Sequence, residues 1–135
     1  VVADRLEPLD GQPHRYDALF HLEAGGARAD GLTVRTSGAG PSLAIRAFGA
    51  GGVDIVTGQK EPVVQGWLPD SSEGYGGIRP IPTAIFHTTS AVPATVCYVL
   101  HPGPGAASCP VRDVALSGRS LRITMDDGTA RTVEW

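Results

Sequence analysis

Hydrophobic and polar residues alternate along most of this chain. In the segment 14–22 the apolar side chains occupy every second position, at Tyr16, Ala18, Phe20 and Leu22. A period of two residues puts these side chains on one face of an extended strand, so the pattern predicts a half-buried β-strand. Shorter runs of the same kind predict further strands at 32–36, 43–48, 53–57, 62–67, 81–88, 92–100, 111–116, 121–125 and 129–135.

Helices are not indicated anywhere in the chain. No stretch sustains a period of 3.6 residues, and the 18 Gly and 11 Pro are unfavourable inside helices. Turn residues separate the strand-like runs at short, regular intervals. The pattern therefore predicts an all-β fold, an antiparallel two-sheet β-sandwich of about ten short strands with little or no helix.

The last two runs also permit a prediction of their register. Asp127-Gly128 is a turn signal, but a two-residue loop there would pair Val133 with Arg122. A loop of three or five residues keeps Val133 and Trp135 on the face of Leu121, Ile123 and Met125. Since a slip of one residue turns every side chain to the opposite face, the apolar pattern favours the odd loop, with Gly128 at positive φ.

Length and local composition indicate one domain. A chain of 135 residues fits a single β-sandwich domain. A connection rich in Gly, Pro and Ala at 101–110 separates a main block, 1–100, from terminal strands at 111–135. The chain starts at Val1 without a charged and apolar leader, so we expect a mature or excised piece of a longer protein.

Charge narrows the classes of partner. The 11 basic and 14 acidic residues are interspersed and give a net charge of −3. The sequence has no stripe of basic residues, the pattern that would indicate a nucleic acid as partner. No apolar run approaches the length of about 18 residues that a membrane span requires, so none is predicted.

Neither cysteines nor histidines suggest a metal or cofactor. Cys97 lies in an apolar run, where a buried, unreactive thiol is expected, and Cys109 lies in the Gly/Pro-rich connection. A disulfide between them is the alternative, which so sparse a cysteine framework does not favour. His14 and His21 are seven residues apart on one strand and face opposite ways.

The four histidines, which include His87 and His101, are expected to be solvated or hydrogen-bonded, with a pH-dependent role as the alternative. No catalytic motif stands out either. There is no Gly-x-Ser-x-Gly nucleophile motif, and Asp126-Asp127-Gly128 is typical of a turn rather than of paired catalytic carboxylates. We predict no catalytic residue, no metal site and no cofactor in this chain.

One long interruption, at 65–80, carries the candidate binding residues. It contains Trp67, Tyr75 and Arg79 between two strand-like runs. Long structureless loops are uncommon in compact domains and are often functional, and aromatic rings and a guanidinium can hold sugars and carboxylates. We predict substrate binding by these three residues. The alternative is a folded-back flap whose Trp67 and Tyr75 cover the edge of the core.

Several short segments, taken in order, resemble the heparinase II/III-like polysaccharide lyases. Residues Val1-Val2-Ala3-Asp4, His14-Arg15-Tyr16 and Phe20-His21-Leu22 resemble one strand pair of that family. The set continues with Pro62 to Trp67, Tyr75-Gly76, Pro80-Ile81-Pro82-Thr83, Val92-Pro93-Ala94-Thr95 and Leu100-His101-Pro102. The order and spacing agree over residues 1–102.

The resemblance implies the distal part of the family's C-terminal β-sandwich. In such lyases an α-toroid domain precedes the sandwich, and the parent reaction is β-elimination on uronic-acid polysaccharides such as glycosaminoglycans or alginate. The catalytic Tyr and His belong to the toroid, so no position of this chain matches them.

The leading hypothesis is accordingly a non-catalytic module that supports a catalytic α-toroid domain and contacts an acidic polysaccharide. The resemblance favours a periplasmic or secreted location, with the cytoplasm as the alternative. A freestanding carbohydrate-binding or protein-interaction sandwich is the second hypothesis, and a small enzyme with an unrecognised site is the third.

Overall fold

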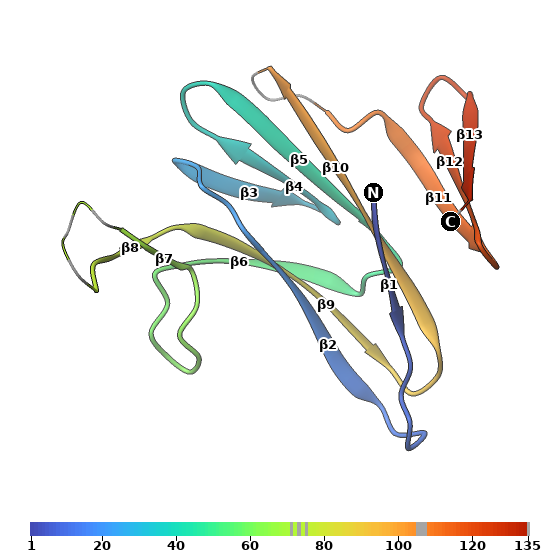
Figure 1. Cartoon of the computed structure of the whole chain (residues 1–135), viewed down its shortest axis with the longest axis horizontal. Coiled ribbons are helices and arrows are strands. Elements are labelled where there is room, and N and C mark those ends of the chain that lie inside the picture. Colours follow the sequence, from blue (N-terminus) through green and yellow to red (C-terminus); the bar gives the residue numbers. More distant parts are fainter. Residues whose placement is uncertain (71, 73, 75, 105–107, 135) are drawn as a thin grey trace.

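A computed structural model describes residues 1–70, 72, 74, 76–104 and 108–134. The described residues form thirteen β-strands and no α-helix (Figure 1). The strands are Val2–Leu6 (β1), His14–His21 (β2), Gly26–Asp30 (β3), Thr33–Ser37 (β4), Pro41–Phe48 (β5), Gly52–Thr57 (β6), Trp67–Pro69 (β7), Ile78–Pro80 (β8), Pro82–Ser90 (β9), Ala94–Pro104 (β10), Val111–Ser117 (β11), Ser120–Met125 (β12) and Ala130–Glu134 (β13).

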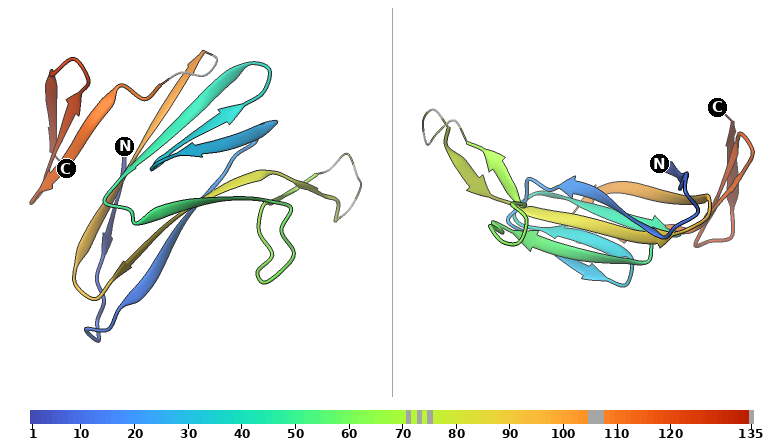
Figure 2. Two further views of the ribbon diagram at one scale, coloured as in Figure 1. Left: turned by 180° about the vertical axis from the view of Figure 1, so that it is seen from behind. Right: turned by 90° about the horizontal axis from the view of Figure 1, so that it is seen from below.

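Two antiparallel sheets form the sandwich (Figure 2). One has the strand order β1-β10-β5-β4-β3 and the other the order β2-β9-β6. Alternate residues of their strands meet in one apolar core. The buried members of this core are Leu22, Val34, Ile45, Ala47, Ala84, Phe86, Val96 and Tyr98.

Three aromatic rings lie in this core. Phe20 on β2, Phe86 on β9 and Tyr98 on β10 contact one another with ring centroids 5.2 to 5.8 Å apart. Edge-on and tilted contacts of this kind add to the stabilisation from burial. Burial, with a smaller contribution from the charge of Asp4, raises the pKa of Tyr98 to about 12. The aromatic cluster thus joins the two sheets.

A third antiparallel sheet, β11-β12-β13, packs against the opposite face of the five-stranded sheet. A second, smaller cluster joins them, made of the buried residues Ala44, Val99, Cys109 and Val111. Both faces of the five-stranded sheet are therefore covered, although by different sheets. Among the described residues, no helix has the length and apolar character needed to cross a membrane.

The prediction of an all-β, antiparallel sandwich is confirmed. In β2 the side chains of Tyr16, Ala18 and Phe20 are half-buried and alternate with exposed neighbours, as the sequence pattern predicted. The strands outnumber the expected ten because β1 and β3 have no clear alternation of apolar and polar residues, and β7 and β8 are only three residues long. The β11-β12-β13 sheet adds a layer to the predicted pair.

The predicted register of the last hairpin is also confirmed. Leu121 pairs directly with Val133, and Met125 N–H donates to the carbonyl of Thr129 at 2.8 Å. The loop between Met125 and Thr129, which this hydrogen bond joins, is three residues long, and Gly128 in it has a φ of 86°. The apolar pattern therefore decided the pairing of Val133, as expected for a period of two, whereas Trp135 lies outside the described residues.

The two cysteines are free thiols and both are buried. The expectation of a buried thiol at Cys97 is confirmed, and burial, followed by the negative charge of Asp4, raises its pKa. Cys109 lies in the Gly/Pro-rich connection and is nevertheless 4% exposed, because it packs beneath the third sheet.

The strand predicted at 62–67 is wrong. Only Trp67 of this segment belongs to a strand, and Val63 and Val64 are exposed at the tip of a loop. Gly66 ends the loop with a φ of 76°, and its carbonyl accepts hydrogen bonds from Gly58 N–H and Ile81 N–H. A Cβ on Gly66 would lie 2.9 Å from the Gly58 nitrogen, so only glycine fits this approach.

The interruption at 65–80 is not structureless. Strands β7 and β8 pair as a hairpin within it, and the hairpin projects from one end of the sandwich (Figure 1). Asp70 N–H donates to the carbonyl of Gly77 beyond the last strand pair. Short strands that contain Pro69 and Pro80 give little alternation, which explains why the sequence indicated only a loop.

Candidate functional site

The β7–β8 hairpin separates two of the predicted binding residues. Trp67 pairs with Pro80, and Leu68 pairs with Arg79. Directly opposed residues share a face and successive residues alternate, so Trp67 and Arg79 point to opposite faces of the hairpin. Tyr75, the third predicted residue, lies outside the described residues. The structure therefore does not bring Trp67 and Arg79 into one binding surface.

Trp67 packs against the loop that precedes it. Its indole Nε1–H donates to the carbonyl of Gln59 at 2.9 Å, and the ammonium of Lys60 lies 5.9 Å from the ring centroid. A Cβ on Gly58 would contact the ring at 3.5 Å. The ring is thus held on one face by the chain itself, an arrangement close to the folded-back alternative that the sequence offered.

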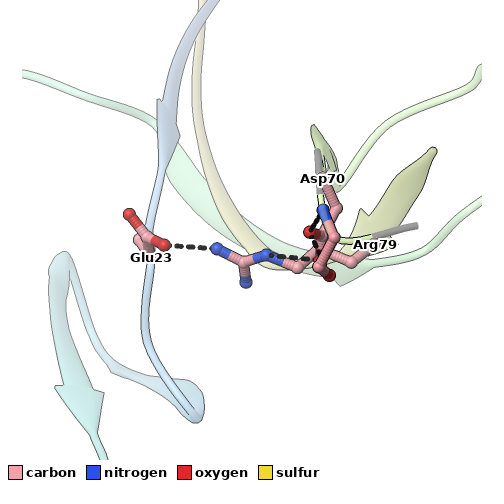
Figure 3. A network of polar contacts seen from close by, with 4 residues as sticks. Glu23, Asp70 and Arg79 are labelled. Atoms are coloured by element: carbon pink, nitrogen blue, oxygen red, sulfur yellow. Dashed lines mark hydrogen bonds and ion pairs between the residues drawn. The ribbon is translucent and has the colours of Figure 1, made fainter. Parts of the chain in front are cut away.

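Arg79 bridges two carboxylates from different parts of the chain. Its Nη2 donates to Glu23 Oε1, just after β2, and its Nε lies 3.5 Å from Asp70 Oδ2, just after β7 (Figure 3). The side chain of Glu23 is 76% exposed, whereas that of Asp70 is 21% exposed. The pair with Glu23 ties the projecting hairpin to the sandwich and faces solvent on one side.

Asp70 is the better-fixed partner of the two. Its Oδ1 accepts from the hydroxyl of Ser72 at 2.6 Å and from the Ser72 N–H at 3.0 Å. These hydrogen bonds, followed by the charge of Arg79, lower the pKa of Asp70. Asp70 therefore keeps a negative charge beside the guanidinium, and its orientation does not depend on Glu23.

A cleft of about 720 Å³ opens beside Arg79. One wall is the last residue of β2 and the chain that follows it, at 21–25. The other wall is the β4–β5 hairpin at 36–43. Its lining combines apolar surface with the polar residues His21, Glu23, Thr36, Ser37, Ser42 and Arg79. The volume lies in the range of small-molecule sites, and the lining offers a guanidinium, an imidazole and hydroxyl groups.

Hydrogen bonds within the walls fix the positions of two hydroxyls. Thr36 Oγ1 accepts from the backbone N–H of Leu43 at 2.8 Å, and the hydroxyl of Ser42 lies 3.4 Å from the carbonyl oxygen of Gly103. The β4–β5 wall is therefore partly preformed. Sugar hydroxyl groups are bound by such preset donors and acceptors.

No protein-family model matches the chain, and no curated protein or solved structure is significantly similar to it. The lyase resemblance thus stays a prediction.

No cluster suited to a metal was found. Within the described parts of the chain, no three His, Cys, Asp or Glu side chains lie together as a metal would require. His14 is 2.7 Å from Asp10, and His87 Nε2 is 3.8 Å from Asp54 Oδ2. These are pairs rather than ligand sets.

Sequence reasoning missed the two partners of Arg79. Glu23 follows a predicted strand directly, and Asp70 precedes Ser72 with the spacing of an Asx turn, a local signal that could have been read. The contact between Glu23 and Arg79 joins residues 56 positions apart, and no pattern in the sequence indicates it.

Proposed function

We propose that this chain is a non-catalytic β-sandwich module of a protein that resembles the heparinase II/III-like lyases, and that the Arg79 cleft holds a carboxylate of an acidic polysaccharide. The observation that carries the proposal is a guanidinium at the side of a cleft, paired there with an exposed carboxylate. The ordered resemblance over residues 1–102 adds a uronic-acid polysaccharide as the class of ligand.

A uronate carboxylate can take the place of Glu23. A guanidinium presents several N–H donors in a planar fork that matches a carboxylate. Exposed ion pairs such as Glu23–Arg79 contribute little to stability, so replacing one carboxylate by another costs little. Asp70 stays behind, because the hydrogen bonds from Ser72 hold it and it keeps the guanidinium oriented.

Binding measurements with carboxylate-bearing and neutral oligosaccharides test the cleft. We expect Arg79→Gln to weaken binding of an alginate or heparin oligosaccharide by about tenfold or more, the usual effect of losing a charge-assisted hydrogen bond. Glu23→Gln should strengthen binding, because it removes the competing carboxylate. Arg131→Gln on β13, far from the cleft in the fold, is the matched control and should leave binding unchanged.

Two results would overturn the cleft assignment. One is equal binding by the wild type and Arg79→Gln. The other is loss of binding in Trp67→Phe with Arg79→Gln unaffected, which would move the ligand to the opposite face of the hairpin. Trp67→Phe keeps an aromatic ring and removes the N–H that Gln59 accepts.

Incubation of the chain alone with uronic-acid polysaccharides tests the non-catalytic part of the proposal. We expect no rise in the ultraviolet absorbance of unsaturated uronides. Robust activity that survives Arg79→Gln would assign the chain an enzymatic role instead.

The second function class, protein interaction, is favoured by a separate observation. An apolar groove of about 630 Å³ lies between β1 and the β11-β12-β13 sheet, separate from the Arg79 cleft. The groove and the cleft share no lining residue.

A further inference from the structure

Strand β1 has one free edge. It lies at the end of the order β1-β10-β5-β4-β3, and among the described strands only β10 pairs with it, from Val2 with Tyr98 to Leu6 with Ala94. In an antiparallel pair, half of an edge strand's backbone N–H and C=O groups point away from the neighbour. Such a row of groups is a template for another strand.

The apolar groove lies beside this edge. Its lining includes Val1, which precedes β1, and Ala3 of β1. From the third sheet it includes Leu116, Leu121, Ile123 and Val133. Val1 is 54% exposed and Val133 is 50% exposed, so part of this apolar surface faces solvent. Figure 1 shows β12 and β13 lying beyond β1, on the side away from β5. The third sheet thus provides an apolar wall next to a free strand edge.

The two sides of β1 differ in character. Ala3 and Arg5 face the apolar groove, whereas Asp4 and Leu6 face a smaller cleft of about 370 Å³. That smaller cleft carries three charged residues, Asp4, Arg15 and Asp17, beside apolar and aromatic ones. A strand added beside β1 would continue the pleat, so its side chains would point alternately into the apolar groove and towards the cleft with these charges.

Charge defines one end of the groove. Arg5 is the one charged side chain among the described residues that line it, and its guanidinium lies 2.6 Å from Glu7 with both side chains largely exposed. An acidic residue of an added strand could pair with Arg5 in the same way. The groove therefore combines backbone donors and acceptors, an apolar wall and a single positive charge.

We propose that β1 accepts an additional strand from a partner protein. The partner segment is extended, has apolar residues at alternate positions, polar residues between them and an acidic residue opposite Arg5. Backbone hydrogen bonds to β1 supply affinity. The apolar groove, lined by Leu121, Ile123 and Val133, receives every second side chain of the added strand and supplies selectivity, as in other cases of β-strand addition. This interaction does not involve the Arg79 cleft.

Selection from displayed peptides of about eight residues, the usual length of a strand, tests the proposal. One library has apolar residues at every second position, and the other has the same composition at helical spacing. We expect the alternating library alone to be enriched on the wild type. Enriched peptides should bind about tenfold more weakly to Val133→Asp, because that substitution puts a charge against their apolar face.

Val133 is half exposed, so Val133→Asp should leave the fold intact. Val64→Asp, at an exposed position in the loop before β7, is the matched control and should bind like the wild type. N-methylation of the selected peptide at alternate residues removes its backbone donors on one edge. One of the two N-methylated series should lose binding, and hydrogen exchange of the β1 amides should slow when the unmodified peptide binds.

Four outcomes would overturn the proposal. Enrichment of the helical library would assign the groove to a helix, and enrichment of neither library would exclude a peptide strand. Self-association of the wild type that is lost in Val133→Asp, with no peptide enriched, would assign the groove to a second copy of the chain. Retained binding by both N-methylated series would show apolar adhesion without strand pairing.

Discussion

The two faces of the five-stranded sheet are packed in different ways. Towards β2-β9-β6 the core contains Phe86 and Tyr98 with Phe20 against them, and these rings meet in edge-on and tilted contacts. Towards β11-β12-β13 the buried members of the cluster are small, and the larger Phe48, Ile123 and Met125 that pack against them are only partly buried. Since stabilisation by burial scales with apolar area, most of the fold's stability is expected from the aromatic face.

The difference also separates stability from binding. The aromatic face is closed by a sheet that runs along it, whereas the third sheet extends past β1 and leaves the apolar groove beside it. The surface available to a partner thus lies at the margin of the weakly packed layer. Substitutions on the two faces should therefore have unequal effects on unfolding.

The largest effect is expected from Phe86→Ala. Phe86 is 1% exposed at the centre of the aromatic cluster, and its truncation should lower the free energy of unfolding by about 3–5 kcal/mol. Urea unfolding followed by circular dichroism measures the loss. A decrease below about 1 kcal/mol would mean that the cluster is not the main source of stability.

A smaller effect is expected from Val99→Ala on the opposite face. The substitution removes two carbon atoms from a site that is 6% exposed, which should cost about 2 kcal/mol. Val92→Ala, at a position 65% exposed, is the control and should change stability by less than about 0.5 kcal/mol. A loss for Val99→Ala equal to that for Phe86→Ala would remove the contrast between the two faces.

The smallest effect at neutral pH is expected from Tyr98→Phe, whose difference from the wild type should appear only in alkali. The folded pKa of Tyr98 is raised to about 12, above the ordinary value of 10.0. Between these two values the unfolded chain releases the phenolic proton and the folded chain retains it, so wild-type stability falls as pH rises. Below pH 10 this contribution is fully present.

Denaturant midpoints at neutral pH and at pH values between 10 and 12 check this sign. The decline should be shallower in Tyr98→Phe, which has no phenolic proton to lose. Parallel declines in the two proteins would place the alkaline sensitivity in other groups.

The alternating pattern was sufficient to predict what depends on local sequence. It gave the faces of β2, and it gave the register of β12 with β13, because Leu121 and Val133 have to share the apolar face. It could not give the third layer. Which strands become neighbours depends on contacts between distant segments, such as Val2 with Tyr98, that a period of two residues does not encode.

The candidate site was predictable only in part. Arg79, one of the three residues singled out, lines a cleft, and its role in binding stays a prediction. The opposite orientation of Trp67 follows from a strand pairing of only three residues, too short to recognise in the sequence. Glu23 was missed because an exposed acidic residue after a strand has no distinguishing pattern until the fold brings it to Arg79.

Strand β10 contributes to both cores at once. Val96 and Tyr98 enter the aromatic core and Val99 enters the smaller one, while β1 and β5 pair on its two edges. A slip of β10 by one position would misplace residues in both layers together. Neither layer can therefore be packed correctly while β10 is out of register with the other. Its pairing with β1 also requires segments far apart in the sequence, such as Val2 and Tyr98, to meet before either layer is complete. Folding of this chain should therefore be slow and limited by a single long-range encounter.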